Sequence, residues 1–491
     1  QKKLQQQQQQ QQWSTRGTIR QEPLRAAAVT VGSDNVSLNE EDGTIAFIPP
    51  PPPLLPQPRS STFIVPTADV IVDDGKASMS SEIFSLAKTI IGASCFGLPA
   101  AIAAYGSAPS AILSACLVIA GIGSMSGYGF SLIGRVCSYT GATSYQEAWA
   151  KTVSPKSAWM VSGFSVLVCL SSLLAYTMVL TDTTIKLATG FAGISLSKPQ
   201  ALVSLMIPIL LPLCRLKELK KLAPFAMMGI GAILYTVFVM GLRYAQGAYA
   251  LGGKFATVAA ATASSPAFGS VGAAGIFSPS AFVLIGMLAT AFSSHYNAPK
   301  FYNELRDNTV PRYNAVVGSG YLLAGLTYIL VAAFGFLTFG TASGPMVLHN
   351  YAANDGLINV ARLAVAGSIL TSYPLTFTGV RDSVLDLCKV KNRSNKVLDG
   401  VTVGLLATLA ILSLLVTDLG AVWAIGGATY GTALTVLIPP FMFVQCVLKK
   451  QPKEWMKLRK EIPLAVGTAV LGLGMGVIGT FQAIQKFRVV A

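Results

Sequence analysis

Two stretches of the chain place helix-breaking residues and small polar residues inside otherwise apolar sequence. Residues 91–99 read Ile-Gly-Ala-Ser-Cys-Phe-Gly-Leu-Pro, and residues 291–299 read Ala-Phe-Ser-Ser-His-Tyr-Asn-Ala-Pro. A helix that is interrupted at such a point exposes backbone N–H groups, which can bind a carboxylate. It also exposes carbonyl oxygens, which can bind an ammonium group or another cation. A zwitterionic amino acid carries both of these groups.

The two stretches also have a simpler interpretation, because Gly and Pro are common in membrane helices and allow them to pack closely. Their placement favours a site. They begin 200 residues apart, at residues 91 and 291, in the first and sixth of the apolar segments described next. Interrupted helices at matching positions of two halves are typical of the central site of a transporter. Lipid cannot satisfy the freed backbone groups, so such breaks persist beside a cavity or a ligand.

The elements that hold these stretches are predicted to be membrane-spanning helices. Of the 491 residues, 52% are hydrophobic and 12% are charged, whereas soluble proteins contain about 25% charged residues. Apolar segments near the length of about 20 residues that crosses a bilayer recur after Met79. There are eleven of them, at residues 79–104, 108–134, 158–181, 200–214, 223–250, 280–298, 314–339, 357–380, 398–416, 420–447 and 462–485. The sequence therefore predicts an all-α, polytopic membrane protein with eleven transmembrane helices.

The positive charge of the chain lies mainly in loops on one side of the predicted membrane. The formal net charge is +15, but residues 1–78 carry 7 basic and 8 acidic residues. With this segment in the cytosol, 21 of the remaining 29 basic residues fall in cytosolic loops and 4 in loops on the opposite side. This bias is the positive-inside pattern. It predicts a cytosolic N-terminus and an exoplasmic or lumenal C-terminus, and it argues for a lipid bilayer rather than nucleic acid as the partner of the basic residues.

The chain divides into three parts by composition. Residues 1–78 include a glutamine run at 5–12 and a proline run at 49–53, and they are expected to form a disordered cytosolic tail. Residues 79–485 are the membrane domain, and residues 486–491 are a short C-terminal tail. No His-Glu-x-x-His, paired intramembrane aspartates or Gly-x-Ser-x-Gly motif indicates an enzyme. No cofactor or metal site is predicted, and no acidic ring or filter motif indicates a channel.

Residues 85–99, Ser-Leu-Ala-Lys-Thr-Ile-Ile-Gly-Ala-Ser-Cys-Phe-Gly-Leu-Pro, resemble the first-helix signature of the amino acid/auxin permease (AAAP) family. The likeness continues in order through residues 295–305, 334–340, 362–365 and 380–384. This family includes vacuolar, proton-coupled and sodium-coupled neutral amino acid transporters. The resemblance implies secondary active transport of amino acids. It also implies a LeuT-like fold, in which two inverted repeats of five helices are followed by an eleventh helix.

The resemblance also implies which residues contact the substrate and the coupling ion. On the first helix, the carboxylate site would be lined by Gly92, Ala93 and Ser94. On the sixth helix, the facing wall would be formed by Phe292, Ser293 and Ser294. On the eighth span, two hydroxyls fall where sodium-coupled members place an ion ligand, those of Thr371 and Ser372.

Lys88 is the main departure from the sodium-coupled pattern. Sodium-coupled members typically carry Asn at this position, whereas vacuolar and proton-coupled members often carry Lys. A lysine inside a span costs about 2.5–3.5 kcal/mol on insertion scales and usually faces a cavity or a partner. Its ammonium could replace a bound sodium ion, and it could release and rebind a proton. Alternatively, Lys88 extends to the cytosolic interface, since it is nine residues from Met79.

His295 has two interpretations, as a second proton carrier or as a neutral hydrogen-bonding partner within the break.

The favoured function is transport of amino acids, preferably neutral ones, independent of sodium and coupled to protons, across a vacuolar or lysosome-like membrane. Two alternatives keep the same fold: a sodium-coupled symporter, and an amino acid sensor that signals through its cytosolic tail.

Overall fold

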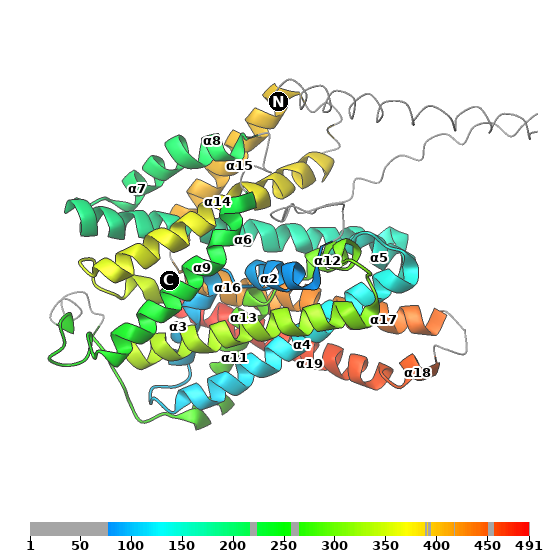
Figure 1. Cartoon of the computed structure of the whole chain (residues 1–491), viewed down its shortest axis with the longest axis horizontal. Coiled ribbons are helices and arrows are strands. Elements are labelled where there is room, and N and C mark those ends of the chain that lie inside the picture. The colour runs from blue at the N-terminus through cyan, green and yellow to red at the C-terminus, as the bar shows by residue number, and fades with distance from the viewer. Residues whose placement is uncertain are drawn as a thin grey trace, which may run out of the picture. The chain divides into compact units, whose positions relative to one another are not determined.

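The computed structural model describes residues 77–216, 223–256, 265–387, 390, 394–416, 418–449 and 456–490, and every named element among them is a helix (Figure 1). All of these residues belong to one compact unit. The expected disordered tail lies outside the described residues, apart from Ala77 and Ser78. The long helices are α4 (Ala111–Thr140), α6 (Trp159–Leu187), α9 (Ala223–Ala245), α13 (Val310–Phe339), α14 (Gly356–Leu387), α15 (Asn395–Leu415) and α19 (Ile462–Val490).

Shorter helices and single turns complete the described part of the chain. The shorter α-helices are α2 (Met79–Ile90), α3 (Leu98–Ala103), α5 (Tyr145–Thr152), α7 (Lys198–Leu205), α8 (Leu211–Cys214), α11 (Ala281–Ala291), α12 (Ala298–Glu304), α16 (Leu419–Gly426), α17 (Ile438–Lys449) and α18 (Met456–Arg459). The 3-10 turns are η2 (Ala93–Gly97), η3 (Pro155–Ser157), η7 (Ala273–Phe277), η8 (His295–Asn297) and η9 (Val347–His349). The π turns are η4 (Ala188–Ala192), η5 (Met206–Leu210), η10 (Gly427–Gly431) and η11 (Ala433–Leu437).

The prediction of an all-helical, polytopic membrane protein is confirmed. Among the described residues, seven helices are long and apolar enough to cross a membrane, and eight if α2 and α3 count as one span with a 46° bend. The remaining three predicted spans coincide with shorter apolar helices, namely 198–214, the described apolar part of α9 at 229–245, and α11. At its C-terminal end α19 continues to Val490, so the helix extends through most of the segment expected to be a tail.

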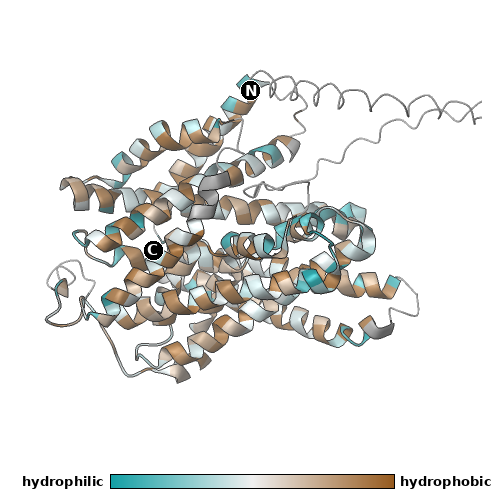
Figure 2. Cartoon of the chain, viewed as in Figure 1, coloured by the Kyte–Doolittle hydropathy of each residue, from teal (hydrophilic) through white to brown (hydrophobic). Residues whose placement is uncertain are grey.

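The outward-facing surface of the long helices is apolar, as a lipid environment requires. Leu117 on α4 is 76% exposed, and Leu322 on α13 and Val470 on α19 are also exposed. Figure 2 shows hydrophobic colour along most of the helical surface, with hydrophilic residues gathered near α12.

Helix ends follow ordinary capping chemistry. Ser78 accepts a hydrogen bond from the amide of Ser81 at the start of α2, for example.

α13 lies against both halves of the first broken helix and against α4 and α9. The close approach to α3 depends on Gly335, because a Cβ at that position would collide with the Pro99 ring. Aromatic side chains fill the space between α4, α12 and α13. The ring of Phe130 lies 6.2 Å from Tyr313 and 5.7 Å from Tyr321. α13 therefore acts as the support on which the two interrupted segments are held.

Ion pairs fasten the helix bundle near both of its ends. Arg135 on α4 makes two hydrogen bonds to Glu461, at 2.7 and 2.6 Å, just before α19 begins. The hydrogen bonds from Arg135 lower the pKa of the Glu461 carboxyl. Toward the opposite end, Arg243 on α9 makes a similar pair of bonds, at 2.8 and 2.6 Å, to the buried Asp355 just before α14.

Candidate functional site

The first helix is interrupted after Ile90. Gly92 has an extended backbone (φ −115°, ψ −175°), and helical structure resumes as a 3-10 turn at Ala93. The first N–H groups of a helical turn have no partner within that turn. The amides at residues 92–94 therefore lie at the beginning of a helical segment, where a negatively charged group is stabilised. A Cβ added to Gly92 would lie 4.0 Å from the hydroxyl of Tyr176, so this hydroxyl from α6 approaches the same break.

The sixth helix is interrupted after Ala291. The amide of Ser294 bonds the carbonyl of Phe292 at 3.0 Å, a tight local turn that cannot continue the α-helix. A 3-10 turn and then α12 follow. Both predicted breaks are therefore present in the structure, at the positions that the glycine, serine and proline residues indicated.

Tyr328 of α13 connects the two breaks. Its hydroxyl lies 2.8 Å from the carbonyl oxygen of Ile90, at the end of α2, and 2.7 Å from the carbonyl oxygen of Ala291, at the end of α11. The hydroxyl has one proton, so it can donate fully to only one of these carbonyls at a time. Sequence reasoning missed this residue. A tyrosine in the middle of the apolar segment 314–339 was the available signal, but nothing in its spacing indicated the two carbonyls.

The side chains of the second break point in different directions. The ring of Phe292 is fully buried and lies 4.8 Å from the ring of Tyr328 and 5.9 Å from that of Tyr321, so it packs toward α13. The Ser294 hydroxyl is also buried, 3.4 Å from the Tyr321 hydroxyl. The hydroxyl oxygen of Ser293 is buried without a hydrogen-bond partner. Of the two serine hydroxyls predicted to line the substrate site, that of Ser293 is therefore the one without a hydrogen-bond partner.

Unpartnered polar atoms gather around the second break. Besides the Ser293 hydroxyl, they are Nδ1 of His295, Nδ2 of Asn297 and the hydroxyl of Ser126 on α4. The other ring nitrogen of His295 donates to the carbonyl oxygen of Ser126 at 2.9 Å. Buried polar groups are nearly always hydrogen-bonded in proteins, so an unpaired group calls for a ligand, an ion or a water molecule. Four such groups therefore lie at or beside the second break.

Lys88 lies on the last turn of α2, beside a small cavity. A Cβ added to Gly229 of α9 would lie 3.5 Å from Cε of Lys88 and 2.5 Å from the hydroxyl of Ser368 on α14. The cavity has a volume of about 20 Å³, and Lys88, Gly229, Thr327 and Ser368 are among the residues that line it. This volume is enough for about one water molecule. No described residue accepts a hydrogen bond from the Lys88 ammonium.

The two hydroxyls predicted on the eighth span are adjacent to this cavity along α14. Thr371 and Ser372 both donate to the carbonyl oxygen of Ser368, at 2.9 and 3.0 Å. The structure therefore brings Lys88 to the same cavity as Ser368, which lies one turn before Thr371 and Ser372 on α14. His295 is not part of this group, because it lies at the second break against α4. In the described part of the chain, no three His, Cys, Asp or Glu side chains come together as metal ligands would.

A family described as "Transmembrane amino acid transporter protein" matches residues 75–485. The chain belongs to this family. It is therefore a transmembrane amino acid transporter and not an enzyme, and the family match covers the whole membrane domain.

Several known proteins are similar to the chain. The bovine protein named "Putative sodium-coupled neutral amino acid transporter 11" is 22% identical over 80% of this chain and 82% of its own length. The fission yeast protein named "Vacuolar amino acid transporter 5" is 25% identical over 82% of this chain and 93% of its own length. Among solved structures, MhsT in complex with L-phenylalanine is 11% identical and covers 83% of this chain and 99% of its own, with a TM-score of 0.49. A Na⁺-coupled sialic acid symporter is 15% identical and covers 84% of this chain and 88% of its own, with a TM-score of 0.44.

Proposed function

We propose that this transporter moves neutral amino acids by a sodium-independent, proton-coupled mechanism, with the substrate bound between the two breaks. The amides of Gly92, Ala93 and Ser94 would hold the substrate carboxylate, and the hydroxyl of Tyr176 would reach the same group. The freed carbonyls of the second break and the hydroxyl of Ser293 would hold the ammonium. The unpartnered polar atoms around the second break support this placement, because a bound zwitterion would give them partners.

Phe292 and Ser294 have a supporting part in this proposal. Phe292 packs against Tyr321 and Tyr328, and the Ser294 hydroxyl contacts Tyr321. These contacts would hold the second break in its open conformation, so that its carbonyls stay directed at the ligand. The inverted repeat of five plus five helices fits the paired breaks of the first and sixth helices.

The position of Lys88 is the observation that carries the coupling proposal. Lys88 lines a cavity of about 20 Å³, so its ammonium group would supply there the positive charge that a bound sodium ion would otherwise bring. The hydroxyls of Thr371 and Ser372, one turn further along α14, donate to the carbonyl oxygen of Ser368 on their own helix. A lysine that releases its proton to one side and regains it from the other would couple transport to a proton gradient.

His295 fits better as a neutral partner than as a second proton carrier. Its Nε2–H donates to the Ser126 carbonyl, and its Nδ1 is buried without a partner. A second proton would place an unpaired, charged N–H in this buried position, which is strongly unfavourable. In this role His295 holds α12 against α4 and leaves Nδ1 as an acceptor for a water molecule or the substrate.

Sodium coupling is the competing function, and the name of the bovine relative favours it. The name of the fission yeast relative, together with Lys88, supports a vacuolar or lysosome-like membrane for this chain. The excess of basic residues in one set of loops supports a cytosolic N-terminus there.

The test is uptake by purified protein in proteoliposomes, with sodium and pH gradients imposed separately. Counterflow with a panel of labelled amino acids first identifies a substrate. We expect wild-type uptake to follow the pH gradient without sodium. Lys88→Asn should lower pH-driven uptake at least about tenfold, which corresponds to about 1.4 kcal/mol of barrier.

Lys156→Asn is the matched control, because it removes an exposed lysine of η3 and should leave the response to pH unchanged. A wild-type protein that requires sodium would refute the coupling proposal. Saturable binding of an amino acid without counterflow would instead favour a sensor.

A further inference from the structure

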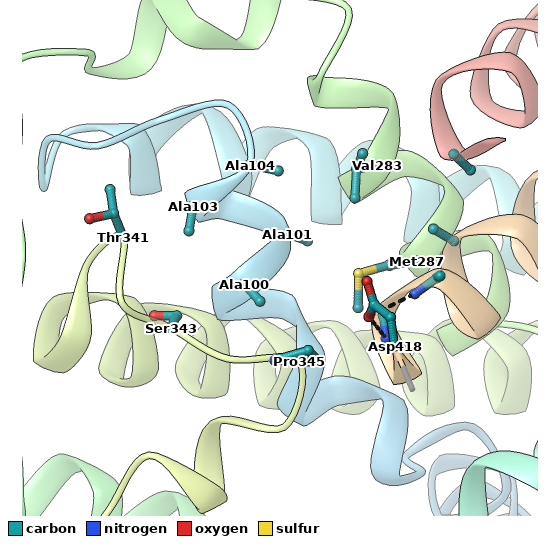
Figure 3. Close-up of a pocket in the computed structure, with 14 residues that line it drawn as sticks. Ala100, Ala101, Ala103, Ala104, Val283, Met287, Thr341, Ser343, Pro345 and Asp418 are labelled. Atoms are coloured by element: carbon teal, nitrogen blue, oxygen red, sulfur yellow. Dashed lines mark hydrogen bonds between the residues drawn. The ribbon is translucent and has the colours of Figure 1, made fainter. Parts of the chain in front are cut away.

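A second cavity lies at the end of the bundle where α3 and α13 finish and α16 begins, the predicted exoplasmic side. Its volume is about 350 Å³, at the lower end of the range for small-molecule sites. Ala100 and Ala101 of α3 and Ala104, just after this helix, form one wall (Figure 3). Thr341 and Pro345 stand at its rim and are exposed, so the cavity opens to the solvent past these two residues.

Two side chains from other helices, Met287 and Trp423, pack against the backbone that follows the first break, and one of them also lines the cavity. Met287 of α11 lines the cavity. A Cβ at Gly97 would lie 2.5 Å from Cε of Met287 and 2.7 Å from Cζ3 of Trp423. Gly97 ends the 3-10 turn that begins next to Gly92. The Met287 and Trp423 side chains are buried, and both lie against Gly97, between Met287's face of the cavity and the residues of the first break.

The cavity has one charged side chain among its lining residues, that of Asp418. One carboxylate oxygen caps α16 by accepting hydrogen bonds from the amides of Gly420 and Ala421, at 2.8 and 3.2 Å (Figure 3). No described residue forms an ion pair with the second oxygen. The remainder of the lining is mostly alanine, with the apolar side chains of Val283, Met287 and Pro345 and with hydroxyls from Thr341 and Ser343. This combination suits a small molecule with one positive charge and a short apolar part.

We propose that this cavity is an outer vestibule in which Asp418 holds the ammonium group of an amino acid before it passes Met287 and Trp423 to the central site. The inference rests on the proposed central site for what lies beyond these two side chains. The carboxylate of the amino acid points toward the open rim, away from Asp418. An anionic molecule is disfavoured in the vestibule, because it would face the same negative charge without a cation to balance it.

Asp418→Asn tests the charge without removing the helix cap, since Asn and Asp cap helices about equally well. We expect the half-saturating concentration for uptake from the exoplasmic side to rise about tenfold, the equivalent of about 1.4 kcal/mol. Asp307→Asn is the control, because Asp307 is exposed and lies between α12 and α13, away from the vestibule. The backbone of Asp307 is left-handed (φ 49°), a conformation that Asn also tolerates. It should leave the half-saturating concentration unchanged.

A second measurement keeps Asp418 intact. Ala104→Cys places a thiol on the cavity wall, and its reaction with membrane-impermeant thiol reagents added to the exoplasmic side is followed against the parent protein. We expect a cationic reagent to react faster than an anionic one, and a transported amino acid to slow the reaction. Adding Asp418→Asn should remove the preference for the cationic reagent.

Equal rates for the two reagents, with no protection by the amino acid, would overturn the vestibule in a protein that still transports. Absence of counterflow in the wild-type protein would overturn the proposed function instead. The charge preference at Ala104→Cys would still be measurable in that case, so the two failures are distinguishable.

Discussion

Replacing Tyr328 with phenylalanine tests whether one hydroxyl holds the two breaks together. The Tyr328 ring is fully buried and contacts Phe292, with ring centroids 4.8 Å apart. Phenylalanine keeps this ring contact and removes only the hydroxyl. The carbonyls of Ile90 and Ala291, now 2.8 and 2.7 Å from that oxygen, then lose their shared donor.

The expected size of the effect follows from the number of protons involved. The hydroxyl donates one proton, so Tyr328→Phe removes about one hydrogen bond and leaves a buried carbonyl without a partner. Such a loss costs about 1–3 kcal/mol in soluble proteins. Hydrogen bonds between membrane helices average about 0.6 kcal/mol and reach about 1.7 kcal/mol. We therefore expect a loss of about 1–2 kcal/mol, which corresponds to a 5- to 30-fold change in an equilibrium constant.

The assay combines thermal unfolding in detergent with counterflow in proteoliposomes. Tyr328→Phe should lower the unfolding temperature slightly and should raise the half-saturating amino acid concentration about 5- to 30-fold, because the unbound breaks no longer keep their relative position. Tyr373→Phe on α14 is the matched control. That tyrosine is equally buried, but its hydroxyl lies 3.0 Å from the Thr177 hydroxyl rather than at a break. It should affect stability similarly and leave the half-saturating concentration unchanged.

Two outcomes would refute the reasoning. In the first, Tyr328→Phe and Tyr373→Phe change transport by the same factor, so the location of the hydroxyl has no importance. In the second, Tyr328→Phe has wild-type stability and transport, so the two short contacts contribute nothing to holding the breaks.

Two further predictions concern the loop between α13 and α14. Asp355→Asn leaves the Arg243 guanidinium without its buried counter-charge and should lower the free energy of unfolding by about 3–5 kcal/mol. Denaturant unfolding measures this free energy, and a decrease of less than about 0.5 kcal/mol would contradict the prediction. Burial, followed by the positive charges of Arg362 and Lys186, lowers the pKa of His349 to about 3. The unfolded chain takes up this proton near pH 6.5, so stability should fall as the pH drops below about 6.5, by up to about 1.4 kcal/mol per pH unit. His349→Gln should flatten this dependence between pH 6.5 and 4, and an unchanged slope would show that other groups cause it.

The membrane helices and the breaks could be predicted because their causes are local in sequence. A run of about 20 apolar residues must form a helix in lipid, where no water satisfies the backbone. Residues 91–99 and 291–299 carry glycine, serine and proline at the points where the structure interrupts α2 and α11. Lys88 could be singled out for the same reason, since a charge inside an apolar run is visible without any neighbour.

The partners of these residues could not be predicted, because they come from distant parts of the chain. Nothing in the spacing of Tyr176 or Tyr328 distinguished them from other aromatic residues in apolar segments. The direction in which the Phe292 side chain points could not be predicted either, because it depends on packing against the ring of Tyr328 on a neighbouring helix. Likewise, the cavity beside Lys88 requires the absence of a side chain at Gly229, which matters only once α9 is packed there.

By itself, the sequence determined the helical membrane class, the beginnings of most spans and the two interrupted segments, and it predicted a bias of basic residues to one side. These properties follow from hydrophobicity, backbone hydrogen bonding and charge, which act on each segment separately. Only the tertiary structure decided that Tyr328 joins the two breaks, that Lys88 and Ser368 line one small cavity, and that Asp418 and Met287 line another. The physical reason is that hydrogen bonds and cavities are formed between helices, and their geometry exists only when those helices are packed together.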